Sequence, residues 1–200
     1  MNHQSIHGKR QEDTDIDRAI ETLRDGGIIL YPTDTVWGLG CDATDPDAVA
    51  KIYAAKHRAD AKALITLMPD TAMLGHYFDK IHPAALDIAR LSTTPVTVIY
   101  DNALPPLAAN LIAQDGSAAV RIPHGSEFCM NLCRRLGRPL VSTSANISGA
   151  PAPATFEEIS PEIIDAADYV CTTGRYDTTP HRPSSIIKIQ SDGQFTIIRK

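Results

Sequence analysis

Residues 28–40 read IILYPTDTVWGLG, an apolar run that leads into a polar loop. The apolar run at 28–31 has the length and composition of a short buried strand. The loop that follows carries two hydroxyls and one carboxylate, and two glycines come after it. Strand ends in α/β proteins commonly border ligand crevices, and glycine lets backbone approach a ligand closely. The alternative is a turn whose threonines and aspartate satisfy local backbone groups.

Outward from this stretch, apolar runs of strand length alternate with segments of helical periodicity, which predicts an α/β or α+β domain. Two of the runs flank a polar segment containing Asp192-Gly193, a pair typical of a hairpin turn. The strand candidates outnumber what a simple parallel fold needs, so we expect a mixed sheet flanked by helices. Besides 28–31, these candidates are residues 64–68, 96–100, 118–122, 140–142, 186–189 and 195–198.

The first helix is predicted from an apolar stripe that runs from Ile16 to Leu23, with Thr14 or Asp15 as its N-cap and Gly26-Gly27 as its stop. Residues 1–14 are polar and lack the apolar stretch of a secretory signal. We therefore expect a flexible leader at 1–14, a cytoplasmic protein, and a single domain over 15–200. Further helices are predicted to open at Asp45-Pro46, to span 127–136, and to follow the capping-box spacing of Thr155 and Glu158.

Composition narrows the class of protein. Of the 200 residues, 43% are hydrophobic and 22% charged, which is typical of a soluble chain with a substantial core. No window approaches the roughly 18 apolar residues of a membrane-spanning helix, so no membrane partner is expected. A net charge of −5 argues against a protein mainly devoted to holding nucleic acid. The four cysteines are scattered without metal-site spacing, so we expect buried thiols and no dedicated metal site.

Two later segments also carry chemistry. Lys56-His57-Arg58, followed by Lys62, could grip a polyanion such as a triphosphate, although cations also suit a solvated helix end. Residues 141–146, VSTSAN, run from an apolar strand into small polar side chains that donate and accept hydrogen bonds. The alternative for this segment is a turn stabilised by serine and asparagine.

Taken together and in this order, the segments resemble the YrdC/TsaC family of threonylcarbamoyl-adenylate synthases, from about Asp15 to Arg199. The resemblance covers most of the chain, and its specificity comes from several motifs at sensible spacing. They are the PTDTVWGLG loop at 32–40, the KxR pair Lys56 and Arg58, the VRIP segment at 120–123, the SxN pair Ser144 and Asn146, and the PSSI strand at 183–186. Leu67 stands where some relatives carry histidine.

The resemblance implies a YrdC-like fold, a twisted mixed sheet with helices around a concave and locally basic cavity. It implies synthesis of threonylcarbamoyl-adenylate and pyrophosphate from ATP, L-threonine and bicarbonate, with Mg²⁺ arriving on ATP. Lys56 and Arg58 would be catalytic and, with Lys62, Ser117, Ser144, Asn146 and Arg199, would bind ATP. The threonine-binding residues would be Thr33, Leu67, Arg121, Ser142 and Ser184. No Walker-type segment is present to act as a P-loop.

Downstream, the resemblance implies transfer of the product to tRNA by threonylcarbamoyl-transferase proteins, and it allows direct contact with tRNA. A non-catalytic RNA-binding module built on the same concave surface is the alternative function. A carbamoyl-transfer enzyme is a second alternative, but the chain lacks the acylphosphatase and zinc-finger segments that accompany such domains in larger proteins. Pyrophosphate release that depends on threonine and bicarbonate separates the enzyme from the binding module.

Overall fold

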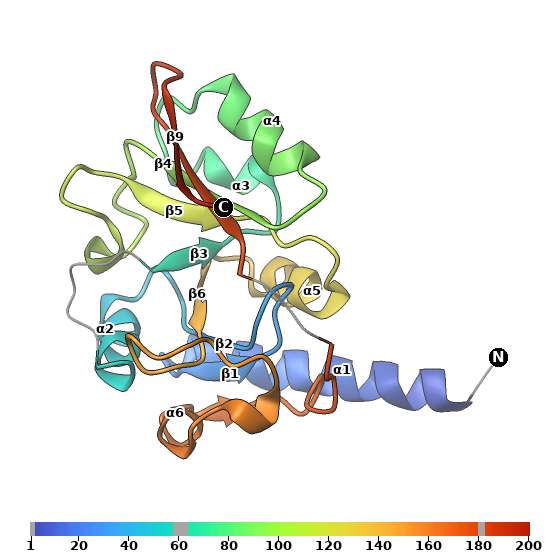
Figure 1. Cartoon of the computed structure of the whole chain (residues 1–200). Coiled ribbons are helices and arrows are strands. Elements are labelled where there is room, and N and C mark those ends of the chain that lie inside the picture. The colour runs from blue at the N-terminus through green and yellow to red at the C-terminus, as the bar shows by residue number, and fades with distance from the viewer. Residues whose placement is uncertain (1–2, 58–63, 180–182) are drawn as a thin grey trace.

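The computed structural model describes residues 3–57, 64–179 and 183–200, with side chains from Gly8 onward (Figure 1). Its α-helices are α1 (His3–Arg24), α2 (Pro46–Ala55), α3 (Thr71–Leu74), α4 (Pro83–Leu91), α5 (Glu127–Leu136) and α6 (Pro161–Asp165), with short 3₁₀ turns η1 (Ala109–Leu111) and η2 (Phe156–Glu158). Its strands are β1 (Ile29–Tyr31), β2 (Gly38–Gly40), β3 (Ile65–Leu67), β4 (Val96–Tyr100), β5 (Ala118–Arg121), β6 (Leu140–Ser144), β7 (Tyr169–Val170), β8 (Ser185–Ile189) and β9 (Phe195–Arg199).

The strands of the described chain form one mixed sheet, which confirms the predicted fold class. The order is β7-β1-β2-β6-β3-β5-β4-β8-β9. The pairs β1/β7, β3/β5 and β4/β8 are parallel, and the other neighbours are antiparallel. The predicted hairpin near Asp192-Gly193 is confirmed, because β8 and β9 pair antiparallel and Gly193 has a positive φ of 91°.

Strand β2, between β1 and β6, reads Gly-Leu-Gly because its neighbours leave no room for side chains on one face. A Cβ added to Gly40 would lie 2.7 Å from the carbonyl oxygen of Val141 and 2.8 Å from a ring carbon of Tyr31. A Cβ on Gly38 would lie 3.1 Å from Thr33 Cγ2. The glycines therefore let the loop after β1 fold back closely against β6.

Alternate residues of β1 pack into two apolar clusters on opposite faces of the sheet. In β1, Leu30 belongs to a cluster with α2 and α4, whereas Ile29 and Tyr31 belong to a cluster with α1 and α5. The stripe from Ile16 to Leu23 packs in this second cluster, as predicted. All four cysteines are buried and free, which confirms the expectation of buried thiols. No described helix has both the length and the apolar character to span a membrane.

The beginning of the chain differs from the sequence prediction. The N-cap expected at Thr14 or Asp15 is wrong, because helix α1 starts at His3, whereas the flexible leader at 1–14 stays a prediction. Asp15 does not cap this helix: it is buried within it and accepts hydrogen bonds from Tyr169 Oη at 2.5 Å and from the backbone N–H of Thr173 at 2.6 Å. In the sequence, Asp15 has the position of a helix N-cap. In the fold, its carboxylate instead accepts hydrogen bonds from the loop after β7.

The helix starts later in the chain follow the predicted signals more closely. Asp45 caps α2, and its carboxylate accepts from the backbone N–H groups of Asp47 and Ala48. Helix α5 has the predicted bounds, 127–136. The capping box at Thr155 is wrong, because Thr155 makes no side-chain cap and Glu158 instead accepts from the backbone N–H of Ala154.

Candidate active site

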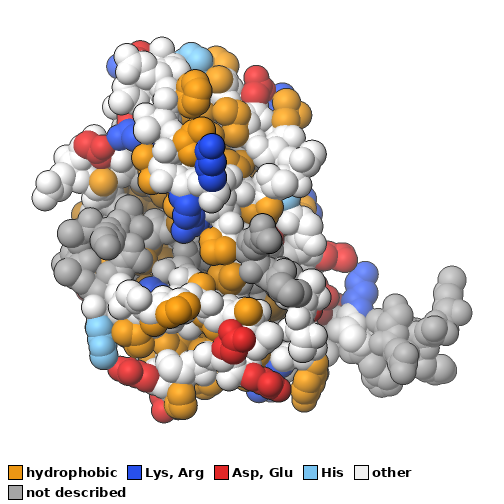
Figure 2. All heavy atoms as spheres, in the orientation of Figure 1, with side chains coloured by type: hydrophobic (Ala, Val, Ile, Leu, Met, Phe, Trp, Pro, Cys, Tyr) orange, Lys and Arg blue, Asp and Glu red, His pale blue; other side chains and the backbone are white. Residues whose placement is uncertain are grey.

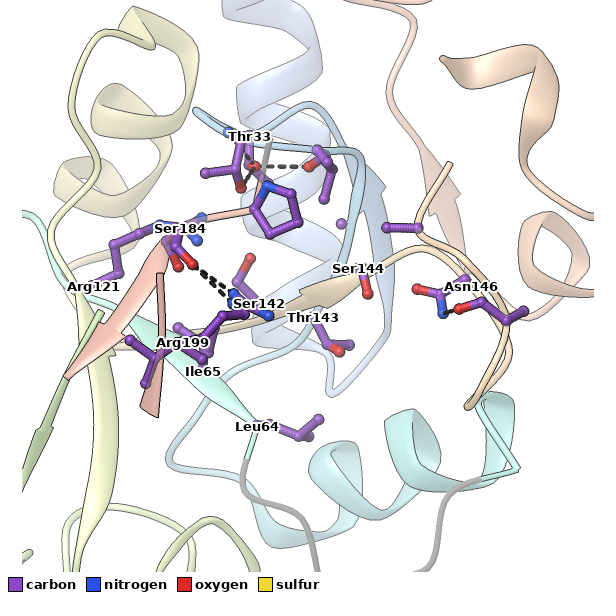
Figure 3. A pocket seen from close by; sticks show the side chains of 17 residues that line it. Thr33, Leu64, Ile65, Arg121, Ser142, Thr143, Ser144, Asn146, Ser184 and Arg199 are labelled. Carbon is purple, nitrogen blue, oxygen red and sulfur yellow. Dashed lines mark hydrogen bonds between the residues drawn. The ribbon is translucent and has the colours of Figure 1, made fainter. Parts of the chain in front are cut away.

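A cavity of about 400 Å³ opens where the ends of several strands converge, within the size range of small-molecule sites. Figure 2 shows this face of the molecule hollowed between the β4–β9 side of the sheet and the β1–β2 side. Figure 3 shows side chains from the loop after β1, from β3, β5, β6 and β9, and from the start of β8 converging on it. The proposed residues on its wall are Thr33, Arg121, Ser142, Ser144, Asn146, Ser184 and Arg199.

Strand β6 and the turn after it form one wall, with Ser142, Thr143, Ser144 and Asn146 facing the cavity. The amide nitrogen of Asn146 donates to the carbonyl oxygens of Ile147 and Ala150, at 2.9 and 2.7 Å. Its Oδ1 is buried and has no hydrogen-bond partner among the described residues. Because a buried acceptor without a partner is costly, this oxygen is well suited to a ligand donor or cation.

Lys56 lies behind this wall rather than on the cavity. The residue is only 2% exposed, and its Nζ donates to the carbonyl oxygens of Ser144 and Asn146 at 2.5 and 2.6 Å. Its own carbonyl oxygen accepts from the backbone N–H of Ser148 at 2.9 Å. Lys56 therefore ties the end of α2 to the Ser144–Asn146 turn. The ammonium bonds backbone carbonyls and is not among the described residues that line the cavity, so the expected contact of Lys56 with phosphate stays a prediction.

Arg121 enters the cavity from the end of β5 with 4% of its side chain exposed. Its Nη2 lies 2.9 Å from Oδ1 of Asp34, whose side chain is completely buried. Its Nε is buried without a hydrogen-bond partner among the described residues. An arginine that keeps an unsatisfied donor on a cavity wall is suited to an anionic ligand group.

Ser184 and Arg199 close the opposite side. The hydroxyls of Ser184 and Thr97 are 2.8 Å apart, and Ser184 exposes only 2%. Arg199 donates through Nε and Nη2 to the carbonyl oxygen of Ser184, at 3.0 and 2.7 Å. These bonds fix the guanidinium of Arg199 over the start of β8, as Figure 3 shows.

The hydroxyl of Thr33 shapes the loop after β1. It donates to the carbonyl oxygen of Val36 at 2.7 Å and accepts from the backbone N–H of Thr35 at 3.0 Å. Below the loop, Trp37 is buried and packs against the ring of Phe156, with centroids 4.9 Å apart. The sequence allowed two interpretations of this loop, a hydrogen-bonded turn or a cavity wall. The structure shows that the same segment is both.

Other proposed residues lie elsewhere. Leu67 is fully buried in the cluster beneath α1 and α5, because the cavity reaches only as far along β3 as Ile65. Ser117 is also absent from the described wall, since its hydroxyl donates to Asp115 at 2.6 Å in a turn before β5. The hydrogen bond from Lys188 and those from Ser117 lower the pKa of Asp115 to about 2. Arg58 and Lys62 lie outside the described residues.

Part of the wall escapes prediction from the sequence. In the sequence, Leu64 and Ile65 can be recognised only as strand residues. An apolar strand residue in a cavity wall cannot be told from one in the core by sequence pattern. Thr143 also lines the cavity, and its place between Ser142 and Ser144 on β6 is the signal that could have found it. The sequence identifies Asp34 only as the acidic residue of its loop. Its ion-pair partner Arg121 is too distant in sequence for their spacing to predict the contact.

Two solved structures with a similar fold support this architecture. Sua5 of P. abyssi complexed with L-threonine has a TM-score of 0.76 and 26% identity, covering 87% of this chain and 50% of that chain. This chain therefore spans about half of that Sua5. YciO of E. coli has a TM-score of 0.79 and 23% identity, covering 92% of this chain and 88% of its own.

Relatives in sequence agree with this likeness. Threonylcarbamoyl-AMP synthase of Stenotrophomonas maltophilia is 37% identical over 172 residues, which are 84% of this chain and 92% of the relative. The protein of the same name from Blochmanniella pennsylvanica is 35% identical over 148 residues, or 70% and 73% of the two chains. The model of the Sua5/YciO/YrdC family, described as "Telomere recombination", matches residues 21–200. Because this match covers most of the sequence, the chain belongs to the Sua5/YciO/YrdC family.

Proposed function

We propose that this chain is an L-threonylcarbamoyladenylate synthase, a nucleotidyltransferase that uses ATP, L-threonine and bicarbonate. The observation that carries the proposal is the gathering of Arg121, Ser142, Ser144, Ser184 and Arg199 on one cavity of about 400 Å³. The relatives named threonylcarbamoyl-AMP synthase support the same activity.

L-threonine would occupy the Arg121 side of the cavity. The guanidinium can pair with the amino-acid carboxylate, and its buried Nε supplies a donor that has no other partner among the described residues. The hydroxyls of Ser142 and Ser184 lie on the same wall, as does the Thr33 loop. The similar fold of P. abyssi Sua5, which was solved in complex with L-threonine, supports this assignment.

ATP would occupy the side formed by Ser144, Asn146 and Arg199. We propose that Arg199 pairs with phosphate oxygens and that Ser144 and Asn146 provide hydrogen bonds. Arg58 and Lys62 stay candidates for the triphosphate, and Ser117 for the nucleoside end. Lys56 also stays a candidate for the phosphate contact, and it would hold the Ser144–Asn146 turn in its binding shape.

The reaction joins two steps. The threonine amine and bicarbonate form a carbamate with release of water, and a carbamate oxygen then attacks the α-phosphorus of ATP as the bond to pyrophosphate breaks. Both reactants are anions, so the cavity must hold them together and stabilise the developing phosphate charge. Positioned arginines and backbone-anchored side chains do this without a dedicated general base.

Mg²⁺ is proposed to arrive on ATP, where it would neutralise phosphate charge. No group of three or more His, Cys, Asp or Glu side chains within the described residues could hold a metal ion. Asn146 Oδ1 is a hard oxygen donor without a partner among them, which suits one ligand position of a nucleotide-bound ion. The protein would thus contribute a ligand but no complete metal cage.

The product is a reactive mixed anhydride, which we propose is passed in the cytoplasm to threonylcarbamoyl-transferase proteins that modify tRNA. Direct contact of this chain with tRNA is part of the same proposal. The names of the relatives support the synthase rather than the non-catalytic RNA-binding alternative.

The test is pyrophosphate release by the purified chain, with mass spectrometry of the nucleotide product. Release should require ATP, L-threonine and bicarbonate together, and Arg121→Ala should lower the rate by about 10²- to 10³-fold, the usual loss for a charge-stabilising donor. Arg138→Ala is the control, because that guanidinium pairs with Asp42 and its side chain is 55% exposed. Binding of tRNA without threonine-dependent turnover would refute the proposed function.

A further inference from the structure

The carboxylate of Asp34 is buried in a loop that borders two cavities. Thr33, Thr35 and Val36 line both the 400 Å³ cavity and a second cavity of about 470 Å³. Asp34 lines the second cavity, whereas Arg121 lines the first. The exposed fraction is 0% for the side chain of Asp34 and 4% for that of Arg121.

Both carboxylate oxygens of Asp34 are directed toward the segment that follows β5. Oδ1 lies 2.9 Å from Arg121 Nη2, and Oδ2 accepts from the backbone N–H of His124 at 3.3 Å. Asp34 thus anchors the segment after β5 through His124 and faces the guanidinium of Arg121 as an ion pair. Neither Asp34 Oδ1 nor Arg121 Nε has a hydrogen-bond partner among the described residues, so the Arg121 Nε donor remains for a ligand.

This pairing changes the charge that a ligand meets. A lone buried guanidinium would present a full positive charge and would attract phosphate strongly. With a carboxylate at 2.9 Å, the Arg121 end of the cavity is close to neutral and still offers a directional donor. Such a site suits a zwitterion with one carboxylate, namely an α-amino acid. At the other end, Arg199 donates to a neutral carbonyl and keeps its charge for phosphate.

We propose that Asp34 is a positioning and specificity residue, which aims Arg121 at the carboxylate of the amino acid and keeps phosphate groups out of that end of the cavity. This inference rests on the proposed function, because it assigns the Arg121 end to the amino-acid substrate. Asp34 acts through Arg121 and does not touch the reacting atoms.

The experiment compares binding of L-threonine to the full chain by calorimetry, without turnover. Asp34→Asn, which keeps the shape and removes the charge, should weaken L-threonine binding by about 10- to 100-fold, because Arg121 loses the ion pair that orients its guanidinium toward the amino-acid carboxylate. The same variant should bind inorganic phosphate about tenfold more tightly in competition with L-threonine, because Arg121 regains its full charge. A merely structural role would not strengthen phosphate binding.

Asp42→Asn is the matched control, because Asp42 is also buried and pairs with an arginine, Arg138, at 2.8 Å, but lies off the cavity. It should lower thermal stability while leaving both affinities unchanged. In an Arg121→Gln background, Asp34→Asn should have no further effect on L-threonine binding. If Asp34→Asn does not fold, Asp34→Glu replaces it, and the displaced charge should weaken L-threonine binding in the same direction.

The outcomes separate this inference from the proposed function. If Asp34→Asn binds L-threonine as tightly as the wild type, or if Asp42→Asn loses as much affinity, the role of Asp34 is overturned and the proposed function stands. If the wild type binds no L-threonine, the proposed function is overturned and this inference with it.

Discussion

The ammonium of Lys56 lies 2.6 Å from the carbonyl oxygen of Asn146, and the two residues belong to different elements of the chain. A second bond to the carbonyl oxygen of Ser144, at 2.5 Å, makes the lysine a clamp on the turn that carries both side chains to the cavity. The position of this turn therefore depends on the buried ammonium group of Lys56.

Replacing Lys56 should affect stability as well as activity. Lys56→Met leaves two buried carbonyl oxygens without their donor, at about 1–3 kcal/mol each, and should lower the melting temperature and the affinity for ATP together. Lys51→Met is the control, because Lys51 lies on α2, just before Lys56, but is exposed and donates to the carbonyl oxygen of Gly26. A Lys56→Met protein of wild-type stability that has lost turnover would instead support direct contact with phosphate.

Replacing Arg199 should act mainly on the nucleotide. Arg199→Ala is expected to weaken ATP binding by about 10- to 100-fold, the usual value of hydrogen bonds from a charged donor, with a smaller effect on L-threonine. Calorimetry with each ligand separates the two. Arg90→Ala, which removes an exposed arginine paired with Asp87 on α4, should change neither affinity. Equal losses for ATP and L-threonine would argue that Arg199 only supports the hairpin.

Stability should depend on pH through Asp15. Burial alone would raise the pKa of this carboxyl, but hydrogen bonds from Thr173 and Tyr169 outweigh it and hold the pKa below its usual value. A lowered pKa contributes stability above the unfolded value of about 4, and this contribution disappears as the pH falls through the folded value. Asp15→Asn should therefore be less stable than the wild type at pH 7, and denaturant unfolding should show the gap closing below about pH 4. A gap that is constant with pH would contradict this explanation.

The close packing around Gly40 of β2 can be tested by adding a single methyl group. Gly40→Ala would place a Cβ 2.7 Å from the carbonyl oxygen of Val141, so β1 or β6 must move and the melting temperature should fall sharply. Gly8→Ala is the opposite case, since no atom lies within 4 Å of the added Cβ in α1. It should be neutral or stabilise the protein by up to about 1 kcal/mol, because alanine favours helix. A tolerated Gly40→Ala would show that β2 is held less tightly by its neighbours than these distances require.

Sequence patterns predicted the elements better than the direction of their side chains. The bounds of α5 and the pairing of β8 with β9 follow from periodicity and turn residues, which act over a few positions. The role of Lys56 does not, because a cation at a helix end is compatible with phosphate, solvent or buried carbonyls alike. Only the folded chain shows which of these partners it meets.

The candidate site was predictable where a motif places polar side chains at the end of a strand, as at Ser144 and Asn146. It was not predictable for Leu67, whose depth along β3 decides whether it meets the cavity or the core. Nor does sequence show that Asp34 and Arg121 form a pair, since their contact depends on the tertiary path of two separate loops.

The cavity takes its walls from almost the whole span of the sequence, from Thr33 to Arg199. During synthesis, the segments of β1, β3, β5 and β6 emerge long before β9, so a nascent chain can build most of the sheet without a finished binding site. Ligand recognition would then appear late, when the β8–β9 hairpin docks on β4. The order of translation itself would keep a partly made chain from engaging nucleotide.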